Sequence, residues 1–253
     1  MKEIIEGLNL PKQILDKTSA FLNKLFGPSI DEFGELFADK VKFTRLKNQI
    51  KIFNKSRELL EKNGLEPREL NLKTLVPLIE KSSVEDDEQL QDKWANLISN
   101  ISTSPETGLE PRLINTLSSL SSLEAKILDF IFEEFCIKRD LRLAYLMNNS
   151  LIKKNYTEKN INLDDIIITF KSIKKNFNLN NEFTKIYIDN LESLGLLRYE
   201  EPEIEIDSGS TSANLNDDDI DLDLDISANY NSSDDFHITT FGNYFINQCK
   251  IQK

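Results

Sequence analysis

Residues 181–199, NEFTKIYIDNLESLGLLRY, decide the fold of the C-terminal part of the chain. Apolar residues recur there at helical spacing, Gly195 stands where a helix would end, and 196–199 form a run typical of a strand. A second helical pattern precedes this stretch at 163–176, and a second strand pattern follows it at 236–239. Helix, helix, glycine, strand and strand is the order of a winged helix. The sequence therefore predicts a winged-helix-like α+β module.

The rest of the chain carries helical patterns, so the predicted fold class is mainly α, with a helical N-terminal and central region before that module. We expect three domains: an N-terminal helical arm with a long basic helix at 1–62, a central helical region at 63–120, and the winged-helix-like domain at 121–253. The expected helices cover about 12–26, 31–62, 72–81, 90–101, 113–120 and 123–135, with a short one after 239.

Two segments have the spacing of a helix-capping box, in which a serine precedes an acidic residue by three positions. They are Ser82-Ser83-Val84-Glu85-Asp86 and Ser121-Ser122-Leu123-Glu124. The first is predicted to open a helix whose apolar side consists of Leu90, Trp94, Leu97, Ile98 and Ile101. Trp94 is therefore expected to anchor the core, and its neighbour Asn96 to hydrogen-bond an adjacent loop.

Length and composition set the class of protein. The chain has 253 residues with 43 acidic and 31 basic side chains, a formal charge of −12, two cysteines and one histidine. Two cysteines cannot form a disulfide framework, and one histidine excludes a multi-histidine metal site. The sequence shows no signal-peptide pattern and no apolar run of bilayer length. A cytoplasmic location is expected.

The negative charge is concentrated in one acidic insert, residues 201–235, which stands where the wing of a winged helix would be. Within it a strictly alternating segment, 219–226, predicts a strand, and its flanks 208–216 and 227–235 are predicted to be flexible linkers. The acids singled out as an interaction surface are Asp217, Asp219, Asp221, Asp223 and Asp225. A strand with one acidic face, weak cation binding and mimicry of nucleic acid all remain open, but the spacing is not that of an EF-hand.

The strongest positive feature is the predicted long helix, in which seven basic residues follow one another without an acid. They are Lys40, Lys42, Arg45, Lys47, Lys51, Lys55 and Arg57. The helix also carries a heptad-like apolar seam at Leu36, Phe43, Leu46, Ile50, Phe53 and Leu60. Packing inside the chain, a homodimer through the seam, and contact with a membrane surface are the three open arrangements.

The acidic cluster at 85–88 is interpreted as helix capping. Consecutive helical residues diverge by about 100° each, so at most two of these carboxylates could converge on one cation. No metal site and no cofactor is predicted. Residues 85–97, EDDEQLQDKWANL, resemble the hallmark stretch of the Abi-alpha (abortive infection alpha) family, a bacterial phage-defence domain. The residues of this motif with an expected structural role are Glu85, Leu90, Trp94 and Asn96.

Other segments fit the same family. They are Phe33-Gly34 with Ala38-Asp39, the basic helix after them, the SLEAKIL segment from Ser122, and the closing Thr239-Thr240-Phe241-Gly242 with Phe245 and Cys249. The resemblance covers about residues 27–200 and 236–249, and the acidic insert is where the chain departs from the pattern. It implies a role in defence against phage but no catalytic residues.

No catalytic site is predicted. Cys136 and Cys249 fit small buried residues better than nucleophiles, and His237 could pair with only one of them. Phosphate-loop and dinucleotide-binding motifs are absent from the sequence. We lean towards a protein that is not an enzyme.

The helix at 181–194 would be the recognition helix of a DNA-binding winged helix, but its charged residues are Glu182, Lys185, Asp189 and Glu192. Because DNA binding needs clustered cations, nucleic-acid binding through this helix is not expected. We expect Phe183, Ile186, Tyr187, Leu191 and Leu194 to face the core.

The sequence favours a non-enzymatic phage-defence protein that acts through protein contacts. The expected partner is a phage component or a neighbouring defence protein. The alternatives are a nucleic-acid-binding regulator that uses the basic helix and an effector that acts at the membrane surface.

Overall fold

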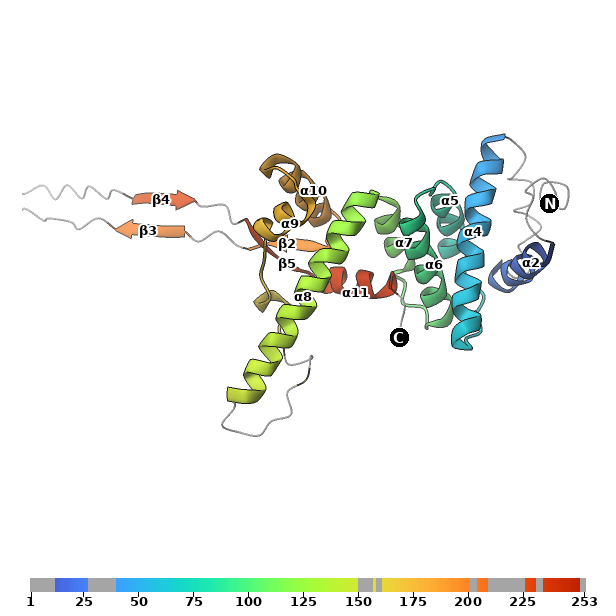
Figure 1. The fold of residues 1–253 in the computed structure, drawn as a ribbon, viewed down its shortest axis with the longest axis horizontal. Coiled ribbons are helices and arrows are strands. Elements are labelled where there is room, and N and C mark those ends of the chain that lie inside the picture. Colours follow the sequence, from blue (N-terminus) through green and yellow to red (C-terminus); the bar gives the residue numbers. More distant parts are fainter. Residues whose placement is uncertain are drawn as a thin grey trace, which may run out of the picture. The chain divides into compact units, whose positions relative to one another are not determined.

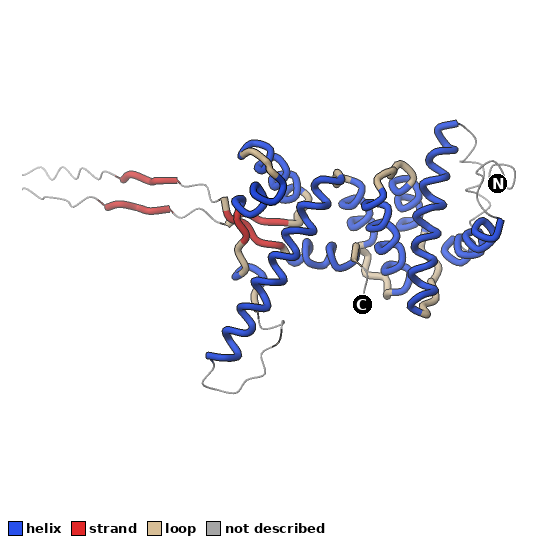
Figure 2. Tube along the Cα trace, in the orientation of Figure 1, coloured by secondary structure: helices blue, strands red, loops and turns tan. Residues whose placement is uncertain are grey.

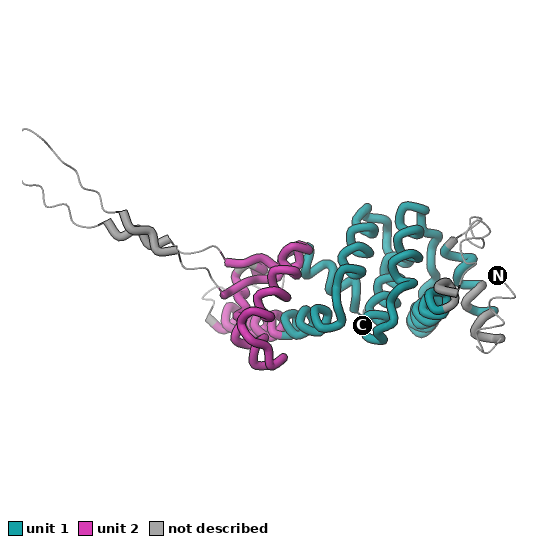
Figure 3. The backbone as a smooth tube through the Cα atoms, turned by 90° about the horizontal axis from the view of Figure 1, so that it is seen from above, with its two compact units in different colours: residues 1–133, 240–253 teal, residues 134–239 magenta. Residues whose placement is uncertain are grey.

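The computed structural model describes residues 12–26, 40–149, 157, 161–200, 204–208, 226–230 and 234–250. Helices predominate in these residues, which confirms the mainly α prediction (Figures 1 and 2). The chain divides into two compact units, unit 1 with residues 1–133 and 240–253, and unit 2 with residues 134–239 (Figure 3). The end of the chain thus returns to the unit that contains its beginning.

Unit 1 is a helical body. Its helices are α2 (Lys12–Phe26), α4 (Lys40–Asn63), α5 (Leu72–Ser82), α6 (Glu88–Thr103), α7 (Glu110–Ser118), the first part of α8 (Ser122–Asn149) and α11 (Thr240–Gln248). α4 packs against α6 and α2, and α5 packs against α7. Ser56 and Ser99 share a hydrogen bond of 3.0 Å between buried hydroxyls, where their small side chains let α4 and α6 approach closely.

The starts of two helices test the capping predictions. Ser121 and Glu124 form the expected box at α8: the Ser121 amide donates to the Glu124 carboxylate (2.7 Å), and the Glu124 amide donates to the Ser121 hydroxyl (3.3 Å). The other prediction is wrong, because α5 continues through Ser82 and Asp87 caps α6 by accepting from the amide of Leu90 (3.0 Å). An ionised Asp at this position also suits the positive end of the helix dipole.

Unit 2 holds a small antiparallel sheet in the order β1-β5-β2. Its elements are the end of α8, a 3₁₀ turn η4 (Leu163–Asp165), β1 (Ile168–Thr169), α9 (Phe170–Phe177), α10 (Asn181–Ser193), β2 (Leu197–Tyr199), β3 (Ile204–Ser208), β4 (Ile226–Tyr230) and β5 (Asp235–Ile238). Gly195 follows α10 with φ +73°, which glycine adopts without strain and which turns the chain into β2. The predicted order of helix, helix, glycine, strand and strand is therefore present.

The predicted helix at 163–176 is shorter than expected. The β-branched run 166–169 leaves the helix and supplies β1, which pairs with β5, so that α9 begins only at Phe170. β-branched side chains lose rotamer freedom in a helix and pack well on a sheet, which accounts for the difference.

The acidic insert contains a β-hairpin in its described residues. β3 pairs with β4 antiparallel, with Ile204 opposite Tyr230 and Ser208 opposite Ile226. β4 lies in a range that we predicted to be a linker, so that prediction is wrong for residues 227–230. The alternating segment with Asp217, Asp219, Asp221, Asp223 and Asp225 lies outside the described residues.

Candidate interaction surfaces

The basic helix predicted at 40–57 is part of α4, and three of its cations are held by contacts within unit 1. These contacts run from Arg45 Nε to Ser83 Oγ (2.8 Å), from Lys55 Nζ to Asp92 Oδ1 (2.6 Å) and from Arg57 Nη1 to Glu61 Oε1 (2.6 Å). A second Arg45 nitrogen donates to the carbonyl of Glu80 (3.3 Å). These three cations hold unit 1 together or neutralise its own acids, so they are poorly placed to bind a phosphate backbone.

Lys47 and Lys51 remain available on α4. Both are exposed, and neither makes an ion pair within the part of the chain that the structure describes. Their spacing of four residues places them on one face, one turn apart. The side chains of Lys40 and Lys42 lie outside the described residues. The basic surface that the structure describes is therefore much smaller than the seven residues of the sequence suggest.

Charge reversal distinguishes a cation that is held within unit 1 from the two exposed lysines of α4 by its effect on stability. Arg45→Glu is expected to lower the free energy of unfolding by about 1–3 kcal/mol, because it removes the hydrogen bonds to Ser83 and to the carbonyl of Glu80 and puts a half-buried acid in their place. Lys47→Glu with Lys51→Glu should stay within about 0.5 kcal/mol of the parent. Urea unfolding measures both.

The same doubly reversed protein tests the nucleic-acid alternative. We expect the parent to bind duplex DNA no tighter than about 10⁻⁴ M at physiological salt, and the reversal to change that little. If the parent bound DNA more tightly than this, in a salt-sensitive way, and the doubly reversed protein did not, the nucleic-acid-binding alternative would be supported.

Three residues of the apolar seam are buried within the chain, whereas Leu46 is half-buried and the side chains of Leu36 and Phe43 lie outside the described residues. Ile50, Phe53 and Leu60 are each at most 5% exposed, so a dimer or a lipid surface could reach them only if unit 1 unpacked. Homodimer formation stays a prediction that needs another surface. In the described residues no helix is both long and apolar enough to cross a membrane.

The motif at 85–97 builds the start and the buried face of α6. Leu90 is 3% exposed and Trp94 is fully buried, as expected of core residues. The carboxylate of Glu85 accepts from the amide of Asp87 (3.0 Å), and Gln91 donates to the carbonyl of Glu85 (3.0 Å). These contacts fix the chain just before α6. Nowhere in the described ranges do three or more His, Cys, Asp or Glu side chains gather as metal ligands would.

Two carboxylates of this motif have pKa values shifted in opposite directions. Burial raises the pKa of Glu85 above its usual value. The hydrogen bond from the Leu90 amide, helped by the Ser122 hydroxyl, lowers the pKa of Asp87. The folded protein therefore favours the ionised form of Asp87.

Asp87→Asn tests this capping charge, because asparagine is also a good cap but does not titrate. The stability that Asp87 contributes is present above its ordinary pKa of 3.8 and is lost as pH falls through its lower folded pKa. We expect the free energy of unfolding of the parent to fall more steeply than that of Asp87→Asn below about pH 4. Urea unfolding between about pH 3 and 7 measures it, and parallel curves would contradict the assignment.

The other end of the motif connects α6 to the last helix of the chain. Asn96 donates to the carbonyl of Cys249 (3.3 Å), and Asn100 donates to the carbonyls of Gln248 (2.7 Å) and Lys250 (3.4 Å). Carbonyls at a helix C-terminus lack partners within the helix, so these two amides cap α11. Segments about 150 residues apart in sequence, both part of the resemblance, thus contact each other inside unit 1.

The sequence profile of a protein family described as abortive infection alpha matches residues 40–249. The chain belongs to the abortive infection alpha family. The resemblance found on the motifs is confirmed, although the match begins at Lys40 rather than near residue 27 and also runs across the acidic insert. No curated protein and no solved structure matches the chain. Membership in the abortive infection alpha family suggests a role in defence against phage.

In this abortive infection alpha chain, α10 does not bury all the apolar residues that we expected. Its buried residues are Thr184, Ile188 and Leu191. Phe183 is 51% exposed and Ile186 is 50% exposed, so the prediction that both face the core is wrong. Thr184 takes a buried place because its hydroxyl donates to the carbonyl of Asn180 (2.7 Å) and needs no outside partner. The two large apolar side chains lie on the outer side of the helix instead.

Cys249 is buried as expected, whereas Cys136 is only half-buried. Complete burial raises the pKa of Cys249 to about 12, which disfavours the reactive thiolate. His237 Nδ1 lies 2.8 Å from a Glu200 carboxylate oxygen and joins β5 to the end of β2. In this abortive infection alpha chain, the contact between His237 and Glu200 therefore lies within unit 2.

Proposed function

We propose that this abortive infection alpha protein is a non-enzymatic defence protein, and that unit 2 is a winged-helix-like module that binds a protein through the outer face of α10. The strand order β1-β5-β2 with α9 and α10 between β1 and β2 supports the winged-helix-like interpretation. The exposure of Phe183 and Ile186 is the observation that carries the proposal.

The chemistry of α10 favours a protein over DNA. Its exposed charged residues are Glu182, Lys185 and Asp189, so acids outnumber bases on the helix that would enter a DNA groove. Acids in that position repel phosphates, whereas DNA readers cluster Lys and Arg. The partner that fits is a protein surface with an apolar centre and an excess of basic residues around it.

The apolar component gives the contact its affinity. Phe183 and Ile186 are three positions apart, so they lie side by side on one face of α10. A few well-packed residues contribute most of the binding energy in protein interfaces, and buried aromatic anchors are prominent among them. Their exposure costs the free protein little, but a partner that covers them gains from removing their apolar area from water.

Phage plating tests the proposal. Phe183→Glu combined with Ile186→Glu is expected to reduce protection by at least about tenfold, because two desolvated anchors become charges. Both sites are exposed, so the free energy of unfolding should change by less than about 1 kcal/mol.

The matched control is Leu72→Glu. Leu72 is 52% exposed, close to the exposure of Phe183, but it lies at the start of α5 in unit 1. An acid in a first helical turn is tolerated, so this variant should fold and protect like the parent. Full protection by the α10 variant, or equal loss with Leu72→Glu, would contradict the proposal.

The acidic insert is proposed to assist the same contact by attracting a basic partner. Replacing residues 209–225 by a short neutral linker keeps β3 and β4 and removes six acids, Asp217, Asp218, Asp219, Asp221, Asp223 and Asp225. We expect a slower association that depends less on salt. Unchanged protection and unchanged salt dependence would remove the insert from the mechanism.

A further inference from the structure

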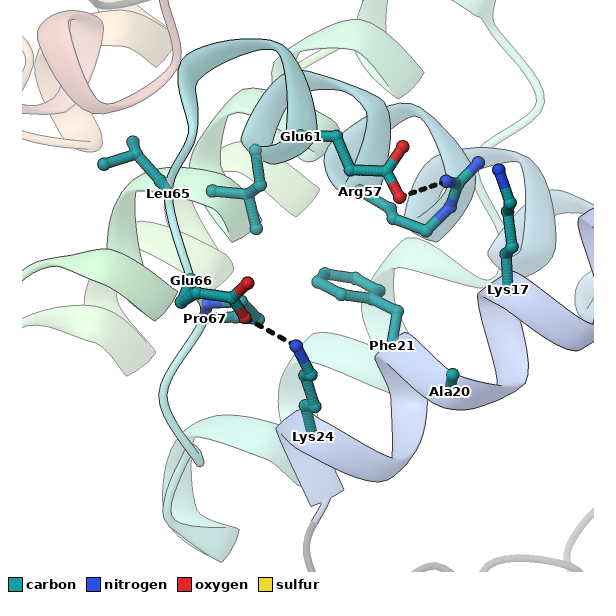
Figure 4. Close-up of a pocket in the computed structure, with 10 residues that line it drawn as sticks. Lys17, Ala20, Phe21, Lys24, Arg57, Glu61, Leu65, Glu66 and Pro67 are labelled. Atoms are coloured by element: carbon teal, nitrogen blue, oxygen red, sulfur yellow. Dashed lines mark hydrogen bonds and ion pairs between the residues drawn. The ribbon is translucent and has the colours of Figure 1, made fainter.

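We propose that a pocket between α2, α4 and the segment after α4 binds a small molecule with a carboxylate and a short apolar chain. The pocket has a volume of about 190 Å³ and lies wholly within unit 1 (Figure 4). Nothing in the function proposed for unit 2 depends on it. Since water occupies about 30 Å³ per molecule in the liquid, the pocket has room for roughly six waters. That volume fits a short acyl chain.

The inner part of the pocket is apolar and fixed. Phe21 of α2 and Leu60 of α4 line it, with 4% and 3% exposure. The ring of Phe21 packs on that of Phe53, with centroids 6.4 Å apart. α2 is tied to the next segment, because the amide of Leu70 donates to the carbonyl of Leu25 (3.1 Å). An apolar chain entering here meets preformed side chains.

The charged residues around the pocket leave one cation without an anion. Three cations line it, Lys17, Lys24 and Arg57, against two acids, Glu61 and Glu66. Lys24 pairs with Glu66 (2.5 Å) and Arg57 pairs with Glu61 (2.6 Å). Lys17 makes no ion pair in the part of the chain that the structure describes. Arg57 also lies 3.7 Å from Glu58, so within the described residues it is Lys17 that is left to attract an anion.

Arg57 supplies a second, independent sign, a donor without a hydrogen-bond acceptor. Only 9% of its side chain is exposed, and its Nε has no hydrogen-bond partner among the described residues. A buried donor left unpaired is costly. In Figure 4 the Lys17 amine and the Arg57 guanidinium point to the same side of the pocket. A carboxylate between them would accept from both, with charge-assisted hydrogen bonds.

The apolar part and the charged part of the pocket together indicate the class of ligand. An inorganic anion would satisfy Lys17 and Arg57 but leave Phe21 and Leu60 uncovered. An uncharged alcohol would cover the apolar side chains but leave the cations unmatched. A short-chain carboxylate does both, and hexanoate is the probe of this class.

Isothermal titration of the full chain tests the site. Hexanoate is expected to bind with a Kd of about 1 mM, reasonable for eight non-hydrogen atoms. Hexanol, which has the chain without the charge, and acetate, which has the charge without the chain, should each bind at least about tenfold more weakly.

Two substitutions locate the binding. Lys17→Gln removes an exposed cation and should weaken hexanoate roughly tenfold, whereas Lys47→Gln, an exposed lysine elsewhere on α4, should leave the Kd unchanged. Arg57→Gln, with its fold checked by circular dichroism, should weaken binding at least as much as Lys17→Gln. The proposal is overturned by no binding up to about 20 mM, by equal Kd values for hexanol and hexanoate, or by equal Kd values for Lys17→Gln and the parent.

Discussion

Trp94→Ala is expected to cost about 3–5 kcal/mol in the free energy of unfolding, the range for truncating a large buried aromatic side chain. Trp94 is fully buried in α6, between the capped start of that helix and the amides that hold α11. The loss is a large fraction of the total stability of an ordinary domain, so unit 1 should be partly unfolded at physiological temperature. Urea unfolding followed by circular dichroism measures it.

A second substitution tells packing from hydrogen bonding at this site. Trp94 Nε1 is buried and has no hydrogen-bond partner among the described residues. Trp94→Phe keeps most of the apolar area and removes that unpaired donor, so it should cost less than about 1.5 kcal/mol. Val84→Ala, at a site 63% exposed, serves as the neutral reference. Similar losses for the alanine and phenylalanine variants would mean that the indole nitrogen makes an essential contact.

Ending the chain after Thr239 is expected to destabilise unit 1 by more than about 3 kcal/mol, even though the segment removed is far from α6 in sequence. Phe245 and Ile246 are at most 2% exposed, and their loss alone removes about 3–6 kcal/mol of burial. The amides of Asn96 and Asn100 would also lose the carbonyls that they cap. The midpoint of thermal unfolding of the shortened protein should fall accordingly.

Two point substitutions within α11, one at a buried and one at an exposed position, show which part of the helix stabilises unit 1. Phe245→Ala should reproduce about 3–5 kcal/mol of the loss. Asn247→Ala, at an exposed site whose amide bonds only within the helix, should cost less than about 1 kcal/mol. Asn100→Ala should lie between them, because it leaves carbonyls unpaired without removing apolar area. A shortened protein as stable as the parent would show that α11 is dispensable.

Local signals in the sequence predicted the elements whose ends are fixed by one or two residues. Gly195 ends a helix because only glycine adopts its backbone conformation without strain, and Ser121 with Glu124 caps α8 because their spacing is sufficient. The error at 163–176 arose where two local preferences compete. The run 166–169 fits a helical period, but its β-branched residues pair with β5 once that strand is present.

The candidate surfaces were harder to predict because they depend on contacts between distant residues. Lys55 looked like part of a basic patch until the fold placed Asp92 within 2.6 Å. Phe183 and Ile186 looked like core residues because helical spacing shows a stripe but not which side faces inward. The pocket at Lys17 and Arg57 joins residues 40 positions apart, and no pattern in the sequence brings them together.

The return of α11 to unit 1 has a consequence for how a cell makes this protein. During synthesis the N-terminal residues leave the ribosome first, and domains generally fold as they emerge. Unit 1 cannot complete its fold in this order, because α11 is translated after the whole of unit 2. A nascent or prematurely ended chain therefore lacks the helix that completes unit 1. Unit 1 can therefore complete its fold only after α11 has been synthesised.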